Sequence, residues 1–160
     1  MSAPSDPPPR FAELAAASNF SFQHGASHPE EMVAEALRLG LSGIGIADRN
    51  TLAGAVRAHM AWRETGAREK GLKLAVGARL VFRDGTPDVI AYPEDRAAYG
   101  RLCRLLTHGN RRAPKGECHL DLPDLLAWAG GLSLIVMPPE RPGTETAETL
   151  ATLAAARPGA

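Results

Sequence analysis

The 160-residue sequence predicts an α/β fold, with mostly parallel strands and one hairpin, as part of an incomplete β/α barrel. Short apolar runs bounded by turn residues alternate with segments in which apolar residues repeat at helical spacing. Asp84-Gly85 lies between two apolar runs and predicts the hairpin. The predicted parallel strands are too few to close a barrel. Because the chain stops after a helix, where a further strand is expected, we expect the front part of a larger barrel.

The elements are expected to begin near Phe11, after a flexible Pro-rich leader formed by residues 1–10. Ser27 and Glu30 predict a capping box around Pro29, so that a first helix begins there and ends at Gly40. A parallel βαβ unit follows, with a buried strand at 43–47 that ends at Asp48, a helix at 51–65 and a strand at 74–78. The later segments are hairpin strands at 80–82 and 89–92, a helix at 94–108, a loop at 109–122, a helix at 123–129, a strand at 132–136 and a helix at 144–156.

Composition excludes several classes of protein. The 18 basic residues balance 18 acidic residues, which argues against a generally polyanion-binding chain of the histone kind. No uncharged apolar run reaches the length of about 18 residues needed to cross a membrane. The N-terminus lacks the pattern of a secretory signal, and two cysteines do not form a disulfide framework. We therefore expect a cytoplasmic protein.

The candidate metal ligands follow no common metal-binding pattern. Cys103, Cys118 and His119 offer three zinc ligands, but no second close pair accompanies them. His24 and His28 are four residues apart, yet Gly25 and Pro29 place them in a loop and a cap rather than on one helix face. Packing or surface roles are favoured over a zinc site.

Asp48 is the best-placed carboxylate, because ligands of α/β folds bind beyond the carboxyl ends of the strands. Two interpretations remain open: a catalytic or metal-binding group, or a helix cap or salt-bridge partner, since Arg49 follows directly. The sequence has no P-loop, nucleophile elbow or Gly-x-Gly-x-x-Gly pattern. Gly43-Ile44-Gly45 precedes the end of its strand, so its glycines are expected to permit close packing.

A basic segment without acidic residues extends from Arg96 to Gly116. The face of the 94–108 helix with Arg101, Arg104 and His108 is expected to lie opposite the face with Leu102, Cys103 and Leu106. Guanidinium groups hold phosphates by charge and paired hydrogen bonds. We expect contact with nucleic acid or an acidic partner through Arg101, Arg104, Arg111, Arg112 and Lys115. The alternative is an ordinary solvated helix face with a basic loop.

Five segments carry a resemblance to a known family: residues 11–14, 18–22, 25–27, 44–54 and 76–80. As a set they resemble the N-terminal PHP (polymerase and histidinol phosphatase) domain of bacterial C-family DNA polymerases, which are polymerase III alpha-like. Residues 48–54, 98–107 and 115–120 resemble the error-prone branch that copies damaged DNA. The resemblance defines a PHP-like domain at 11–139 and a terminal helix and tail at 140–160. It implies a PHP-type β/α barrel.

Active members of this family hold divalent metals through His and carboxylate ligands and hydrolyse phosphoesters, in some cases as a proofreading exonuclease. By the resemblance, the metal-site positions of this chain are Ala15 and Ala17 in place of His-x-His, His24 in place of an acidic residue, Asp48-Arg49 in place of Asp-His, and Arg79 in place of Glu. Methyl and guanidinium groups give a metal no lone pair. The resemblance thus implies a degenerate site without metal, cofactor or catalytic residue. An ion pair between Asp48 and Arg79 is expected to brace it.

The resemblance implies a parent error-prone DNA-directed DNA polymerase, a nucleotidyltransferase of translesion synthesis and DNA repair that uses Mg, deoxynucleotides and a template. This chain holds no candidate for the carboxylate cluster of the polymerase, so we expect it alone to be inactive and structural. Its expected partners are the remainder of the polymerase chain, accessory replication or repair proteins and DNA, but no membrane. Two alternatives are a stand-alone metal-dependent PHP phosphoesterase or exonuclease and a module that binds an acidic protein.

Overall fold

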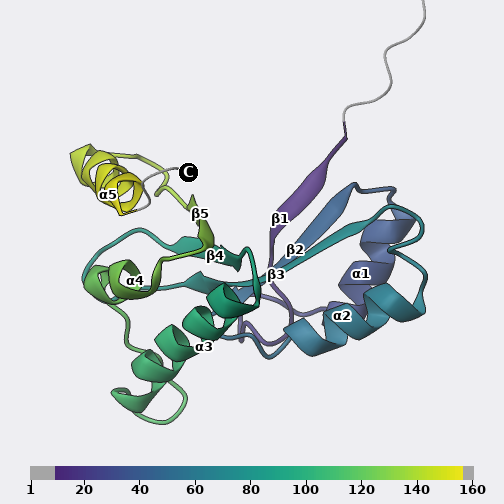
Figure 1. The fold of residues 1–160 in the computed structure, drawn as a ribbon, viewed down its shortest axis with the longest axis horizontal. Coiled ribbons are helices and arrows are strands. Elements are labelled where there is room, and N and C mark those ends of the chain that lie inside the picture. The colour runs from purple at the N-terminus through teal and green to yellow at the C-terminus, as the bar shows by residue number, and fades with distance from the viewer. Residues whose placement is uncertain (1–9, 157–160) are drawn as a thin grey trace, which may run out of the picture.

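The computed structural model describes residues 10–156, so that most of the predicted leader and the last four residues of the tail lie outside the described residues. The elements in chain order are β1 (Ala12–Ala16), α1 (Pro29–Arg38), β2 (Gly43–Arg49), α2 (Ala55–Glu64), β3 (Lys73–Leu80), β4 (Val89–Pro93), α3 (Arg96–Arg111), α4 (Leu122–Trp128), β5 (Leu132–Val136) and α5 (Thr144–Ala155) (Figure 1). None of the helices among the described residues combines the length and the apolar character needed to cross a membrane.

The five strands form one sheet in the order β1-β2-β3-β4-β5. The pairs β1–β2 and β2–β3 are parallel, whereas β4 is antiparallel to both β3 and β5. Strand β5 therefore runs in the same direction as β3. The predicted hairpin is confirmed, and Gly85 takes the positive φ of +84° that its turn requires. The sheet has two open edges, at β1 and β5, which confirms an incomplete barrel.

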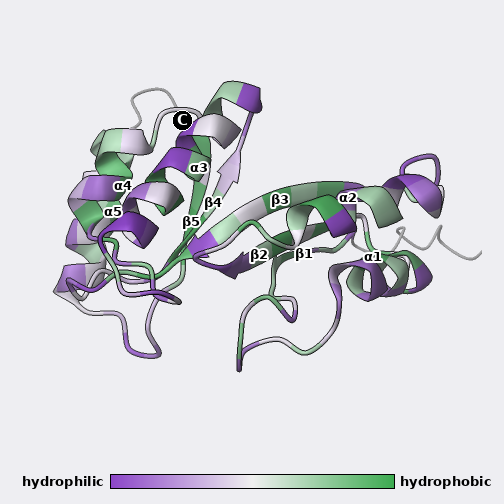
Figure 2. Ribbon diagram, turned by 90° about the horizontal axis from the view of Figure 1, so that it is seen from below, coloured by the Kyte–Doolittle hydropathy of each residue, from purple (hydrophilic) through white to green (hydrophobic). Residues whose placement is uncertain are grey.

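All the helices that pack on the sheet cover the same face of it. The strand register aligns Ile44 with Leu74 and Leu80 with Val89, so these side chains point to one side. Helices α1 and α2 pack around Ile44, and α3, α4 and α5 pack around Leu80 and Val89. The two groups of helices lie at opposite ends of the sheet (Figure 2). The other face of the sheet is the inner face of the incomplete barrel.

On the inner face, Tyr92 of β4 extends across β3 and β2. Its ring lies over Gly77, and its hydroxyl donates a 2.8 Å hydrogen bond to the Leu14 carbonyl of β1. A side chain at Gly77 or Gly45 would occupy the space of the Tyr92 ring. Burial raises the pKa of the Tyr92 hydroxyl above its ordinary value, so it stays a neutral donor. The prediction that Gly45 permits close packing is confirmed.

Several element boundaries differ from those predicted. Helix α1 is capped at His28, whose N–H donates to the Glu31 carboxylate at 2.8 Å, one residue later than the predicted Ser27–Glu30 pair. Glu30 instead contacts Arg57. Helix α2 begins at Ala55, four residues later than predicted. Before it, the Asn50 amide bonds both backbone groups of Val81, directly after β3.

Helix α3 extends further than predicted, and its buried face differs slightly from the face predicted to be buried. It continues to Arg111, because Gly109 packs directly against Cys118 and Leu120 and leaves no room for a side chain there. Its buried face includes Leu105, whereas Cys103, predicted to be buried, is partly exposed. The predicted strands at 74–78 and 80–82 are one strand, β3, which ends at Leu80, and β1 lies where no strand was predicted. The strand at 132–136 agrees with the prediction, and α4 and α5 differ from it by no more than one residue at either end.

Substitution of Gly77 tests the packing of the inner face. In Gly77→Ala, the new methyl group would overlap the Ala91 carbonyl oxygen and lie 2.6 Å from the Tyr92 ring. We expect a loss of about 2 kcal/mol in the free energy of unfolding, measured by urea denaturation. The matched control is Gly100→Ala within α3, where the methyl group meets nothing within 4 Å. This control is expected to raise the free energy of unfolding by about 0.5 kcal/mol. Equal effects of the two substitutions would contradict the packing described.

Candidate functional site

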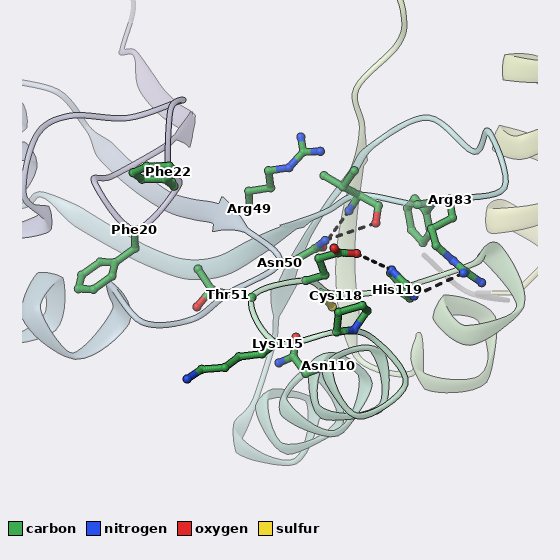
Figure 3. Close-up of a pocket in the computed structure, with 15 residues that line it drawn as sticks. Phe20, Phe22, Arg49, Asn50, Thr51, Arg83, Asn110, Lys115, Cys118 and His119 are labelled. Carbon is green, nitrogen blue, oxygen red and sulfur yellow. Dashed lines mark hydrogen bonds and ion pairs between the residues drawn. The ribbon is translucent and has the colours of Figure 1, made fainter.

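The carboxyl ends of the first three strands surround a cavity of about 900 Å³. Residues 49–51, at the end of β2 and directly after it, form its floor, and Phe20 and Phe22 from the segment after β1 form one wall (Figure 3). Residues 81–83 after β3, Asn110 of α3 and residues 114–119 after α3 complete the lining. Because ligands of α/β folds bind beyond the carboxyl ends of parallel strands, this cavity is the candidate site.

Asp48 is near this cavity in sequence but does not line it. Its side chain is 1% exposed and lies on the helix-covered face of the sheet. Oδ1 accepts hydrogen bonds from the Ser18 N–H and the Ser21 hydroxyl, and Oδ2 accepts one from the Ser18 hydroxyl, each at 2.7 Å. Asp48 is therefore neither a helix cap nor a salt-bridge partner. It anchors the segment that follows β1 to the end of β2.

The predicted ion pair between Asp48 and Arg79 is wrong. Asp48 pairs in register with Ala78 and Arg49 with Arg79, so the two arginines share the inner face and Asp48 points to the other. The Arg79 Nε instead donates to the Asp88 Oδ2 at 2.7 Å, in a pair that remains partly exposed. Because successive side chains of a strand alternate, no rotamer of Arg79 brings it to Asp48 through the sheet.

The other positions implied by the resemblance are dispersed. Ala15 is exposed on β1, and its N–H donates to the Glu13 carboxylate at 2.6 Å. Ala17 is partly exposed just after this strand, and His24 is exposed in the segment that follows. Among residues 10–156, no three His, Cys, Asp or Glu side chains come together as metal ligands. Within the part of the chain that the structure describes, the side chains at these positions therefore do not form a metal site by themselves.

Cys103, Cys118 and His119, the possible zinc ligands, also do not come together as a metal site among the described residues. The Cys118 thiol lies against Gly109, with its sulfur 3.9 Å from the Leu106 carbonyl oxygen. Burial raises the pKa of the Cys118 thiol, although the Arg112 guanidinium acts against it. A raised pKa disfavours the thiolate, which is the form that binds metals. His119 is instead hydrogen-bonded to Glu117 at 2.8 Å.

The predicted basic stripe is divided by the fold. Arg101 donates to the Gly130 carbonyl at 2.6 Å, away from the others. Arg104, Arg111 and Arg112 line a separate groove of about 510 Å³ with Trp128. Lys115 lines the candidate site instead. The five residues therefore do not present a single surface, and their contacts with nucleic acid or protein stay a prediction.

Arg112 is engaged within the protein. It donates to the His119 carbonyl at 2.6 Å and forms an ion pair with Asp124 at the start of α4. Burial alone would raise the pKa of the Asp124 carboxyl, but bonds from the Asp121 N–H and from Arg112 together hold it below its ordinary value. These contacts fix the segment after α3, which forms one wall of the cavity, to α4.

Sequence reasoning overlooked three residues of this region as site residues. Phe22 is 84% exposed on the cavity wall, and Arg83 lines the cavity from the segment after β3. Ser21 is buried and positions Asp48. The aromatic side chains in 18–22, between a strand and a helix with no apolar periodicity around them, are the signal that could have identified Phe22.

The different surroundings of Asp48 and Arg79 predict different effects of substitution. Asp48→Ala leaves the Ser18 N–H and two buried serine hydroxyls without their acceptor and is expected to lower the free energy of unfolding by about 3 kcal/mol. Arg79→Gln removes a partly exposed ion pair and is expected to lower it by about 0.5 kcal/mol. Urea denaturation measures both. Comparable losses for the two variants would show that Asp48 is not the anchor described.

Comparisons with known proteins agree with this geometry. The family model described as PHP domain matches residues 13–143. An error-prone DNA polymerase from Brucella abortus is 57% identical over 150 residues, which are 93% of this chain and 14% of the relative. One from Rhodopseudomonas palustris (strain BisB5) is 60% identical over 133 residues, or 83% of this chain and 12% of the relative. The chain thus spans about a seventh of the length of these relatives.

Solved structures show the same fold at low sequence identity. A protein assigned as a metal-dependent phosphoesterase from Bifidobacterium adolescentis is 21% identical with a TM-score of 0.51, over 94% of this chain and 52% of that one. An amidohydrolase from Chromobacterium violaceum is 17% identical with a TM-score of 0.62, over 91% of this chain and 74% of that one. The family match, the relatives and the strand arrangement lead to one conclusion: the chain belongs to the PHP domain family.

Proposed function

We propose that this chain is the N-terminal PHP module of an error-prone DNA polymerase of damage-tolerant synthesis and repair, and that its metal site is degenerate. The observation that carries the first part is the 57% identity over 150 residues to an error-prone DNA polymerase. The matched residues are only 14% of that relative, so polymerisation, with its Mg and deoxynucleotides, belongs to the rest of such a chain. The proposal includes a cytoplasmic location and accessory replication or repair proteins as partners.

The second part rests on the charges at the ends of β2 and β3. Arg49 and Arg79 are neighbours in the register on the inner face, where the resemblance places a metal-binding His and a Glu. A divalent cation about 5 Å from one guanidinium would be destabilised by roughly 7 kcal/mol at an effective dielectric constant of 20. The Asp88 carboxylate offsets one of the two positive charges. The remaining charge and the methyl groups of Ala15 and Ala17 disfavour metal binding.

In this proposal the module contributes structure rather than catalysis. Its open strand edges and inner face are the surfaces that a longer polymerase chain would cover. The stand-alone metal-dependent phosphoesterase is the alternative, and the test of metal binding separates the two.

Metal titration tests the degenerate site. Calorimetry of the chain with Mn²⁺ or Zn²⁺ is expected to show no saturable binding, because the described residues supply no set of three ligands. Hydrolysis of bis(p-nitrophenyl) phosphate and of single-stranded DNA is expected to stay at the background rate with Mn²⁺ present. Turnover that co-elutes with the chain and disappears with EDTA would contradict this part of the proposal.

A chimera tests the structural role. The matching residues of the Brucella relative are replaced by those of this chain, and primer extension and thermal unfolding are compared with the parent polymerase and with a variant that lacks the module. We expect the chimera to extend primers and unfold like the parent, because 57% of the matched residues are identical. The variant without the module is expected to unfold at a lower temperature. A folded chimera that does not extend primers would show that this chain is not such a module.

A further inference from the structure

The floor of the candidate cavity carries an arginine without a partner. Arg49 is exposed, and its guanidinium makes no hydrogen bond or ion pair within residues 10–156. Its register neighbour Arg79 is compensated by Asp88. Like charges on neighbouring strands repel each other, so an uncompensated guanidinium here is a charge that an incoming anion would neutralise.

The same cavity presents an aromatic ring and a second free cation. Phe22 is 84% exposed on one wall, although burying such a side chain contributes about 2 kcal/mol. Lys115 extends from the segment after α3 and also makes no hydrogen bond or ion pair among the described residues (Figure 3). The acidic residue of the lining, Glu117, is paired with His119. Arg83 adds a further cation, shared with Asp121.

We propose that this cavity binds a segment of single-stranded DNA without metal, with a base stacked on Phe22 and backbone phosphates held by Arg49 and Lys115. Proteins that bind single strands combine a positively charged groove with aromatic rings on which bases stack. In duplex DNA the faces of the bases are already stacked and inaccessible to Phe22. A cavity of about 900 Å³ suits a short segment of strand.

This inference rests on the proposed function, because Arg49 is free to bind a phosphate only if no metal cluster forms beside it. It adds a ligand and three contact residues to that function. Arg104 and Arg111 belong to a different groove and take no part in it.

The test is fluorescence anisotropy with the full chain and a labelled oligonucleotide of twelve thymidines, measured in EDTA between 50 and 200 mM salt. The unaltered chain is expected to bind more weakly as salt rises. Arg49→Gln and Lys115→Gln are each expected to lower the slope of log affinity against log salt by about 0.7, the value for one phosphate contact to a single strand. Phe22→Leu is expected to weaken binding about tenfold at an unchanged slope, because it removes base stacking.

Matched substitutions elsewhere serve as controls. Phe11→Leu changes a phenylalanine that is 62% exposed and lies directly before β1, at the opposite end of that strand from the cavity. Arg63→Gln changes an exposed arginine on α2. Both variants are expected to bind the oligonucleotide like the unaltered chain. Circular dichroism of every variant verifies that the fold is retained.

Four results would overturn the inference. The first is no binding by the unaltered chain, and the second is binding of a duplex or of an oligoglutamate peptide as tight as that of the single strand. The third is unchanged binding by both Phe22→Leu and Arg49→Gln. The fourth is a weakening of binding by Arg104→Gln alone. Because EDTA removes free divalent metal, these results are independent of the metal titration. Failure here and failure of the proposed function are therefore distinguishable.

Discussion

The buried carboxyl group of Asp48 is the contact on which the arrangement of the candidate site depends. Through Ser18 and Ser21 it ties the segment after β1 to the end of β2, and it does so with hydrogen bonds rather than with a cation. Gly54, just before α2, packs so closely on it that a Cβ there would lie 2.7 Å from Oδ2. The wall with Phe22 and the floor with Arg49 are therefore held by a single buried group.

The two arginines on the inner face differ in whether an acidic side chain neutralises them. Arg79 is neutralised by Asp88, which belongs to the segment just before β4. Arg49 has no such partner within the described residues, and the cavity it lines carries a second free cation in Lys115. Charge of this sign repels a metal and attracts a phosphate, so the proposed loss of the metal site and the proposed strand-binding cavity rest on the same physical cause.

On the inner face, two glycines leave room for the ring of a tyrosine from a distant strand. Tyr92 reaches from β4 to the Leu14 carbonyl of β1 only because Gly77 and Gly45 leave its ring room. This contact links strands that are not neighbours in the sheet and favours the curvature of a barrel. The edges at β1 and β5 stay open. A longer chain, such as those of the polymerase relatives, supplies further residues that could cover them.

Much of the local structure was predictable because it depends on short-range patterns. The apolar run of β2, the Asp84-Gly85 turn and the strand at 132–136 follow from residues adjacent in the sequence. Helix ends were less predictable. The cap at His28 depends on which glutamate reaches back to it, and the extension of α3 depends on contacts of Gly109 with residues 118–120.

By itself, the sequence determined which chemical groups are present: an Asp-Arg pair after a buried strand, and alanine and arginine where the resemblance places metal ligands. The tertiary structure alone decided which of these groups face one another. Asp48 and Arg79 were expected to pair, but the register β2–β3 puts them on opposite faces, and Asp88 and two serines take the partner roles. The composition of a site can be read along the chain, whereas the face on which each side chain lies is fixed only when strands far apart in sequence align.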